Sequence, residues 1–94
     1  MQVTLVLPRM LQDKAGGVAR LDLDLDGDPT LDGALDVVAA RHPALERRLR
    51  DESRALRRYV NFYLDGQECR GLAGAGSRLR EGAEIQVVAS VAGG

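Results

Sequence analysis

The sequence lacks most of the residues from which disulfides, metal sites and nucleotide-binding loops are built. Its 94 residues include no tryptophan, one phenylalanine, one cysteine and one histidine. A lone cysteine, Cys69, excludes an internal disulfide and favours a reducing compartment. Together with the single His42 it cannot supply a zinc ligand set. The stretch GLAGAGS lacks the Lys-Ser/Thr ending of a phosphate-binding loop. We therefore expect no metal, no bound cofactor and no reaction catalysed by the chain alone.

The sequence gives no sign that the partner is a nucleic acid or a membrane. Thirteen basic and fourteen acidic residues give a net charge of −1. This balance offers no electrostatic basis for binding a nucleic acid or an anionic membrane. The start, MQVTLVLPRM, is too short for a transmembrane helix and lacks the layout of a signal peptide. We expect one domain over residues 1–94, monomeric alone and cytoplasmic, with a core of Leu, Val, Ile and Ala.

Alternation of apolar and polar residues predicts strands over residues 2–7, 18–28, 59–64 and 83–91. The expected inward-facing side chains are Val3, Leu5, Leu7, Leu21, Leu23, Leu25, Val60, Phe62, Leu64, Ile85 and Val87, with Ala89 as a further candidate. The Asp65–Gly66 turn predicts a short return strand over residues 67–70. Residues 9–17 are expected to form a loop, and residues 71–82 an irregular crossing anchored by Leu79.

Residues 30–41 change to a helical period, with Thr30 as the N-cap. The helix should end or kink at His42–Pro43, because a residue before proline avoids the α region. A further turn is possible over residues 44–49. The charged run RRLRDESRALRR, residues 47–58, predicts a solvated connection, with docking of a partner as the alternative for its arginines.

This order of elements predicts an α+β protein with a β-grasp, ubiquitin-like fold. A mixed sheet of four or five strands would carry one main helix across one face. The first and last strands would lie side by side in parallel at the centre. Residues 90–94, SVAGG, would form a flexible C-terminal tail.

The chain also resembles the ubiquitin-like sulfur-carrier (ThiS/MoaD-like) proteins of thiamine, molybdopterin and cysteine biosynthesis. The resemblance lies in MQVTLVLP at the start, TLDGALDVVAARHPAL across the helix, YVNFYLDGQECR in the third strand and LREGAEIQVVASVAGG at the end. Within this family, VNFY and the terminal VAGG are most similar to the carriers of the cysteine-forming route. One departure is Ala89, where many family members have a proline.

The resemblance implies a protein co-substrate rather than an enzyme, with the Gly94 carboxylate as the site of sulfur attachment. An E1-like adenylyltransferase (MoeB/ThiF-like) would use ATP to adenylate it. A sulfurtransferase or other sulfur source would then form a thiocarboxylate, for delivery to an acceptor biosynthetic enzyme. Gly93, Ala92 and Val91 would thread into the partner.

Two other functions fit the same residues. A ubiquitin-like modifier would be joined through Gly94 to lysines of targets, and a β-grasp adapter would have an inert tail. Tyr59, Tyr63 and Val88 are expected on the sheet face opposite the helix, as a docking face or as incidental exposure.

Two groups of residues invite a chemical role that the pattern does not favour. Cys69 has no activating partner in the sequence, so a partly buried or edge-strand thiol is expected. Aspartates at positions 22, 24, 26 and 28 lack the spacing of a calcium loop, so a solvated outer face is expected.

Overall fold

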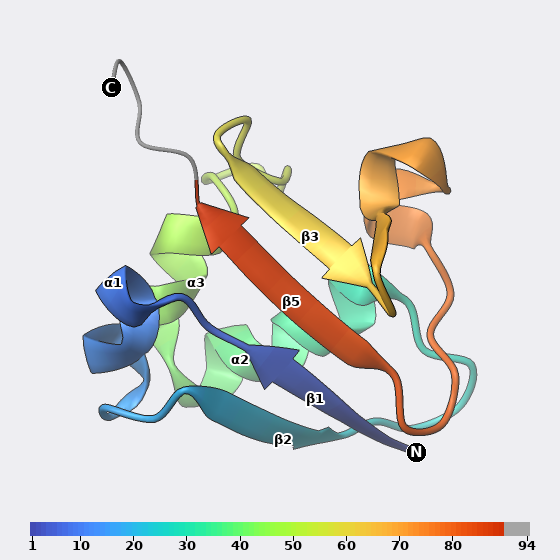
Figure 1. Cartoon of the computed structure of the whole chain (residues 1–94), viewed down its shortest axis with the longest axis horizontal. Helices are drawn as coiled ribbons and strands as arrows, with labels where there is room; N and C mark the ends of the chain where they lie inside the picture. The colour runs from blue at the N-terminus through green and yellow to red at the C-terminus, as the bar shows by residue number, and fades with distance from the viewer. Residues whose placement is uncertain (90–94) are drawn as a thin grey trace.

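The computed structural model describes residues 1–89, and it is built around a five-stranded mixed sheet with strand order β2-β1-β5-β3-β4 (Figure 1). The strands are β1 (Gln2–Val6), β2 (Arg20–Asp24), β3 (Val60–Leu64), β4 (Gln67–Glu68) and β5 (Glu84–Ala89). Strands β1 and β5 are parallel, and every other neighbouring pair is antiparallel. This is the β-grasp arrangement, so the predicted fold class is confirmed.

The last strand, β5, lies at the centre of the sheet. Its pairing with β1 extends as far as Gln86, which lies beside Val6, and its pairing with β3 extends to Ala89, which lies beside Val60. The parallel pairing places Met1 at the opposite end of the sheet from Ala89 (Figure 1). There the terminal ammonium of Met1 donates a hydrogen bond to the Leu25 carbonyl at 2.8 Å.

Helices α2 (Leu31–Arg41) and α3 (Pro43–Leu49) connect β2 to β3. The Thr30 hydroxyl accepts a hydrogen bond from the Gly33 amide at 3.2 Å, which confirms the predicted N-cap. The break falls at His42, as predicted from the proline that follows it. Beyond it the chain forms a helix of seven residues, longer than the single turn considered from the sequence.

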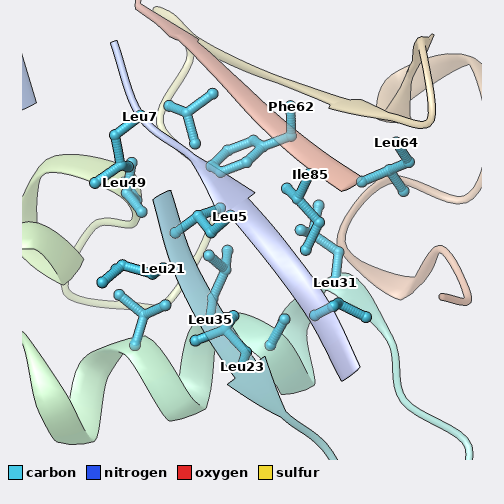
Figure 2. Close-up of a cluster of buried hydrophobic side chains, with 14 of the residues drawn as sticks. Leu5, Leu7, Leu21, Leu23, Leu31, Leu35, Leu49, Phe62, Leu64 and Ile85 are labelled. Atoms are coloured by element: carbon cyan, nitrogen blue, oxygen red, sulfur yellow. The ribbon is translucent and has the colours of Figure 1, made fainter. Parts of the chain in front are cut away.

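The core lies between the sheet and these helices (Figure 2). The strand residues predicted to face inward are buried, and so is Leu79, whereas the further candidate Ala89 is half-buried. Figure 2 shows their side chains meeting those of the helices. The largest of them include Leu5, Leu23, Leu31, Leu35, Phe62 and Ile85. With one phenylalanine in the chain, this core depends on branched aliphatic packing, in which the loss of even one methylene is destabilising.

One local prediction was wrong, and a second, the short return strand, was right in kind but too long. Residues 9–17 are not a plain loop, because they contain helix α1 (Arg9–Gln12) and a 3₁₀ turn over Asp13–Ala15. Leu11 and Ala15 are buried there, and this contact with the core holds the segment in a compact form. The return strand after Gly66 is only two residues long, since a 3₁₀ turn begins at Cys69.

The expectation that residues 47–58 are fully solvated was also wrong, because Arg50 is only 2% exposed. Its guanidinium donates to both Glu46 carboxylate oxygens, at 2.9 and 3.0 Å. It also donates to Asp32 at 3.1 Å and to Asp36 at 2.9 Å. The Arg50 side chain therefore links the end of α3 to two aspartates of α2.

These contacts keep the buried Arg50 charged. Burial by itself would lower the pKa of Arg50, but hydrogen bonds and Coulomb attraction from Glu46 and Asp36 outweigh it, so the pKa is raised. A cation buried with satisfied hydrogen bonds contributes little net stability compared with an apolar group. Removing it alone is costly, because the partner carboxylates keep their positions without a counter-charge.

We expect Arg50→Ala to lower the free energy of unfolding by about 3 kcal/mol, measured by urea denaturation. The matched control is Arg54→Ala, which removes an exposed partner of the same aspartate, Asp36, at 3.0 Å. Exposed ion pairs contribute less than about 1 kcal/mol. Equal losses in the two variants would contradict the role given to Arg50.

Candidate functional site

The predicted attachment site follows directly on the end of β5. Val91, Ala92, Gly93 and Gly94 lie outside the described residues, so the site is approached through the strand that precedes them. Strand β5 is hydrogen-bonded on both sides along its first half, and to β3 as far as Ala89. The sheet therefore fixes the point from which residues 90–94 continue.

Of the three predicted docking residues, Val88 and Tyr59 lie near this end of β5, and Tyr63 lies farther along the outer sheet face. Val88 is 38% exposed and lies opposite Asn61, whereas Tyr63 is half-buried and lies opposite Gln86. Val88 and Tyr63 are thus diagonal neighbours on one face, within reach of each other's side chains. Tyr59 is 44% exposed just before β3. The structure brings a small apolar surface to the end of β5.

Arg70 holds the segment that carries Tyr59, and sequence reasoning missed it. Its guanidinium donates to the carbonyls of Arg57 at 3.1 Å and Val60 at 3.2 Å, and to the Asn61 side chain at 2.8 Å. The charged Arg70 guanidinium, bonded to these carbonyls, orders the chain just before β3. It thereby positions Val60, the strand partner of Ala89.

Arg50 and Arg70 differ in whether the sequence signals their contacts. Glu46 and Arg50 stand four residues apart in a helical segment, a spacing that favours an ion pair. That signal was available. Arg70 reaches backbone carbonyls ten and thirteen residues earlier, and no local pattern predicts such a contact.

Cys69 is fully buried, more deeply than the partly buried or edge-strand position that was predicted. Burial, with the nearby Glu68 charge, raises the pKa of its thiol above the ordinary value. At neutral pH a raised pKa leaves less of the reactive thiolate. The thiol therefore behaves as part of the core.

The aspartates of β2 and the following turn face solvent, as predicted. Among residues 1–89, no group of three or more acidic, histidine or cysteine side chains is arranged to hold a metal ion. Asp28 forms an ion pair with Arg78, and Asp24 lies 3.6 Å from the Met1 ammonium. In the same range, none of the helices combines the length and apolar character needed to cross a bilayer.

A β-grasp domain whose central last strand continues into a Gly-Gly sequence defines the class of ubiquitin-like carriers and modifiers. The chain belongs to the ThiS family, whose family model matches residues 6–94. The match includes all the strands except part of β1, and it extends through the two glycines.

Named relatives include both carriers and modifiers. The sulfur carrier protein CysO of Mycobacterium tuberculosis is 29% identical over the whole of both chains. Small archaeal modifier protein 1 of Haloferax volcanii is 31% identical over 86% of this chain and 88% of the relative. Its crystal structure superposes with a TM-score of 0.85 at 30% identity over all of both chains.

A third structure is that of a BexX/CysO complex from Amycolatopsis orientalis. Its matching chain has a TM-score of 0.82 and 28% identity, over 98% of this chain and 99% of that one. The relatives are small carrier and modifier proteins, which makes this chain a sulfur carrier or ubiquitin-like modifier of the same family.

We expect iodoacetamide to alkylate Cys69 at least about tenfold more slowly in the folded chain than in the chain unfolded by guanidinium, at mildly alkaline pH. The reason is that unfolding removes both the burial and the raised pKa. The rates are followed by intact mass, with glutathione as the reference thiol. Equal rates in the two states would show that the thiol is accessible and reactive in the folded protein.

Proposed function

We propose that this chain is a sulfur carrier protein, and that the carboxylate of Gly94 is the group that carries the sulfur. It acts as a protein co-substrate that partner enzymes process. We place it, like those enzymes, in the cytoplasm. The observation that carries the proposal is the full-length similarity to a named sulfur carrier, CysO, together with a family match that includes Gly93 and Gly94. The same similarity favours delivery of sulfur to cysteine, with another sulfur-containing metabolite as the alternative.

The reaction has two steps, both carried out on the chain by partners. An E1-like adenylyltransferase joins the Gly94 carboxylate to the α-phosphorus of ATP and releases pyrophosphate. A sulfur nucleophile then attacks the carbonyl carbon of the acyl adenylate, so that a C–S bond forms and AMP leaves. The resulting thiocarboxylate is a better nucleophile than the carboxylate and transfers its sulfur in an acceptor enzyme.

The residue types before the carboxylate suit entry into a narrow active site. Gly93 and Gly94 carry no Cβ and accept backbone angles that other residues avoid. Ordering such residues costs roughly 1–2 kcal/mol each in backbone entropy. With Val91 and Ala92 they thread into the partner, so contacts made by the folded domain must offset the entropy cost.

The apolar surface at the end of β5 is suited to provide those contacts. Tyr59 and Val88 are exposed, and Tyr63 lies beside Val88 on the same face. Interfaces concentrate their binding energy in a few such aromatic and aliphatic groups. Docking here would bring the partner to the strand from which residues 90–94 continue.

A second function is supported by a specific observation. The similarity to small archaeal modifier protein 1 favours a modifier, in which a lysine amine attacks the activated Gly94 carbonyl and AMP leaves as an isopeptide bond forms. Both functions need the same activation. They differ in whether sulfur or nitrogen takes the acyl group.

Intact-mass analysis of the chain from its native cells separates these functions. A carrier shows replacement of one terminal oxygen by sulfur. A modifier shows covalent conjugates of larger proteins, and an unmodified chain under sulfur demand indicates an inert adapter.

One alanine appended after Gly94 should abolish sulfur loading, because the reacting carboxylate moves to a residue with a Cβ and one position too far. The control carries the same alanine before Met1, at the opposite end of the sheet, and should load normally. Both are compared by intact mass after a thermal melt has shown that they fold. Normal loading of the C-terminally extended chain would refute the proposed site.

Val88→Asp should weaken binding to the activating enzyme by roughly tenfold, because a carboxylate replaces an apolar contact at the interface. Leu72→Asp is the matched control, since Leu72 is also exposed, at 47%, but lies outside the β5 end. Isothermal titration with the adenylyltransferase measures both. A loss confined to Leu72→Asp would place the docking face elsewhere.

A further inference from the structure

Charge is segregated along this nearly neutral chain. Residues 22–36 contain six aspartates and no basic residue, whereas residues 47–58 contain six arginines and two acidic residues. The first set belongs to β2, the turn after it and the start of α2. The second set belongs to the end of α3 and the connection to β3. The net charge of −1 therefore hides two regions of opposite sign.

The basic region lies at the end of β5. The Arg57 amide donates to the Leu49 carbonyl at 3.0 Å, and its guanidinium donates to the Arg47 carbonyl at 2.8 Å. The Val60 amide donates to the Arg57 carbonyl at 3.1 Å, and Val60 is the strand partner of Ala89. Figure 1 shows the end of α3 and the start of β3 beside the tip of β5. These contacts join the arginine-rich connection to the last described residue of β5.

Four of these arginines have no acidic partner within residues 1–89, and we call them the tail-side arginines: Arg47, Arg48, Arg57 and Arg58. Three are exposed and Arg57 is half-buried. Arg50 and Arg54, by contrast, are paired with acidic side chains. The positive charge at this end is therefore available to a partner.

Two of these arginines, Arg57 and Arg58, line a shallow groove of about 360 Å³ next to Tyr59. Asp51 and Leu56 complete its lining. The Asp51 carboxylate is already used, because it accepts hydrogen bonds from the Ser53 amide, the Ser53 hydroxyl and the Ala55 amide. The groove thus combines the Leu56 and Tyr59 side chains with the exposed guanidinium of Arg58 and with that of Arg57, which is held by a backbone carbonyl.

The short length of chain after Ala89 limits how far from the end of β5 an enzyme can act on Gly94. Five residues follow Ala89, and a five-residue chain spans at most about 18 Å when extended. A catalytic centre that reaches Gly94 must therefore cover the protein surface around the end of β5.

We propose that the enzyme that activates Gly94 carries an acidic rim beside its entry channel and docks it on the tail-side arginines. This inference rests on the proposed function and specifies the partner's surface. Carboxylates pair with guanidinium groups in two-bonded geometry, which sets orientation as well as charge. Opposite charges also speed the encounter, so the arginines should act mainly on the rate of association.

The test compares two double charge reversals in the full chain. Arg48→Glu with Arg58→Glu changes the tail-side arginines and leaves Arg57, with its backbone contact, intact. Arg78→Glu with Arg80→Glu is the matched control, because it makes the same change of net charge. Arg78 and Arg80 are exposed, and they line a larger hollow of about 430 Å³ that includes Ala83, just before β5.

The readout is ATP-dependent loading by the adenylyltransferase of the source organism, measured as pyrophosphate release at several salt concentrations. We expect the tail-side reversal to slow loading by about tenfold at low salt and progressively less as salt screens the charges. The control should change the rate by less than about twofold. Thermal melts of both variants show that the fold is kept.

Each contrary result has a separate meaning. Equal rates for the two reversals, or a larger effect of the control, would overturn the acidic-rim proposal and leave the carrier function standing. If the tail-side reversal slowed loading equally at all salt concentrations, the acidic-rim proposal would also be overturned, because attraction between charges weakens as salt is added. Absence of loading in the unaltered chain would overturn the proposed function, and this inference with it.

Discussion

The pairing of β5 with β1 on one side and β3 on the other is the constraint on which the rest of this fold depends. A strand paired in parallel with the first strand of the chain cannot be reached by a hairpin. The chain therefore crosses from one side of β1 and β5 to the other through α2 and α3. That crossing supplies the helices that cover the core. The opposite face of the sheet stays open to solvent. Pairing with β3 as far as Ala89 fixes the position of the end of β5 in the sheet.

Two arginines, Arg50 and Arg70, hold the segments that surround the end of β5. Arg50 holds α3 against α2 through three carboxylates, and Arg70 holds the turn before β3 through two backbone carbonyls. Both uses depend on a planar group with several donors in fixed directions, which a lysine ammonium does not have. The hydrophobic core determines that the chain folds. These contacts determine how the connection between α3 and β3 sits next to Ala89.

Much of the fold could be predicted because its elements are marked by local patterns. Alternation identified the faces of four strands, and the three- and four-residue spacing with Thr30 identified α2. The misses have a common cause. Leu11 and Ala15 are buried in the common core, which no local period records, and Arg50 is enclosed by Asp32 and Asp36, 18 and 14 residues away, besides the local Glu46. The outward position of Tyr63 and Val88 followed from parity in β3 and β5, whereas the contacts of Arg70 and the grouping of the tail-side arginines required the structure.

The parallel arrangement of β1 and β5 also separates the two ends of the described chain. Met1 lies three residues before Thr4, the partner of Glu84, and Ala89 lies five residues after Glu84, so the two ends are separated by roughly 26 Å along the strands at about 3.3 Å per residue. An affinity tag or a fluorescent protein joined ahead of Met1 would thus leave the end of β5 unobstructed. The amide created by such a fusion retains a donor for the Leu25 carbonyl. The protein can therefore be immobilised through Met1 while partners approach the end of β5.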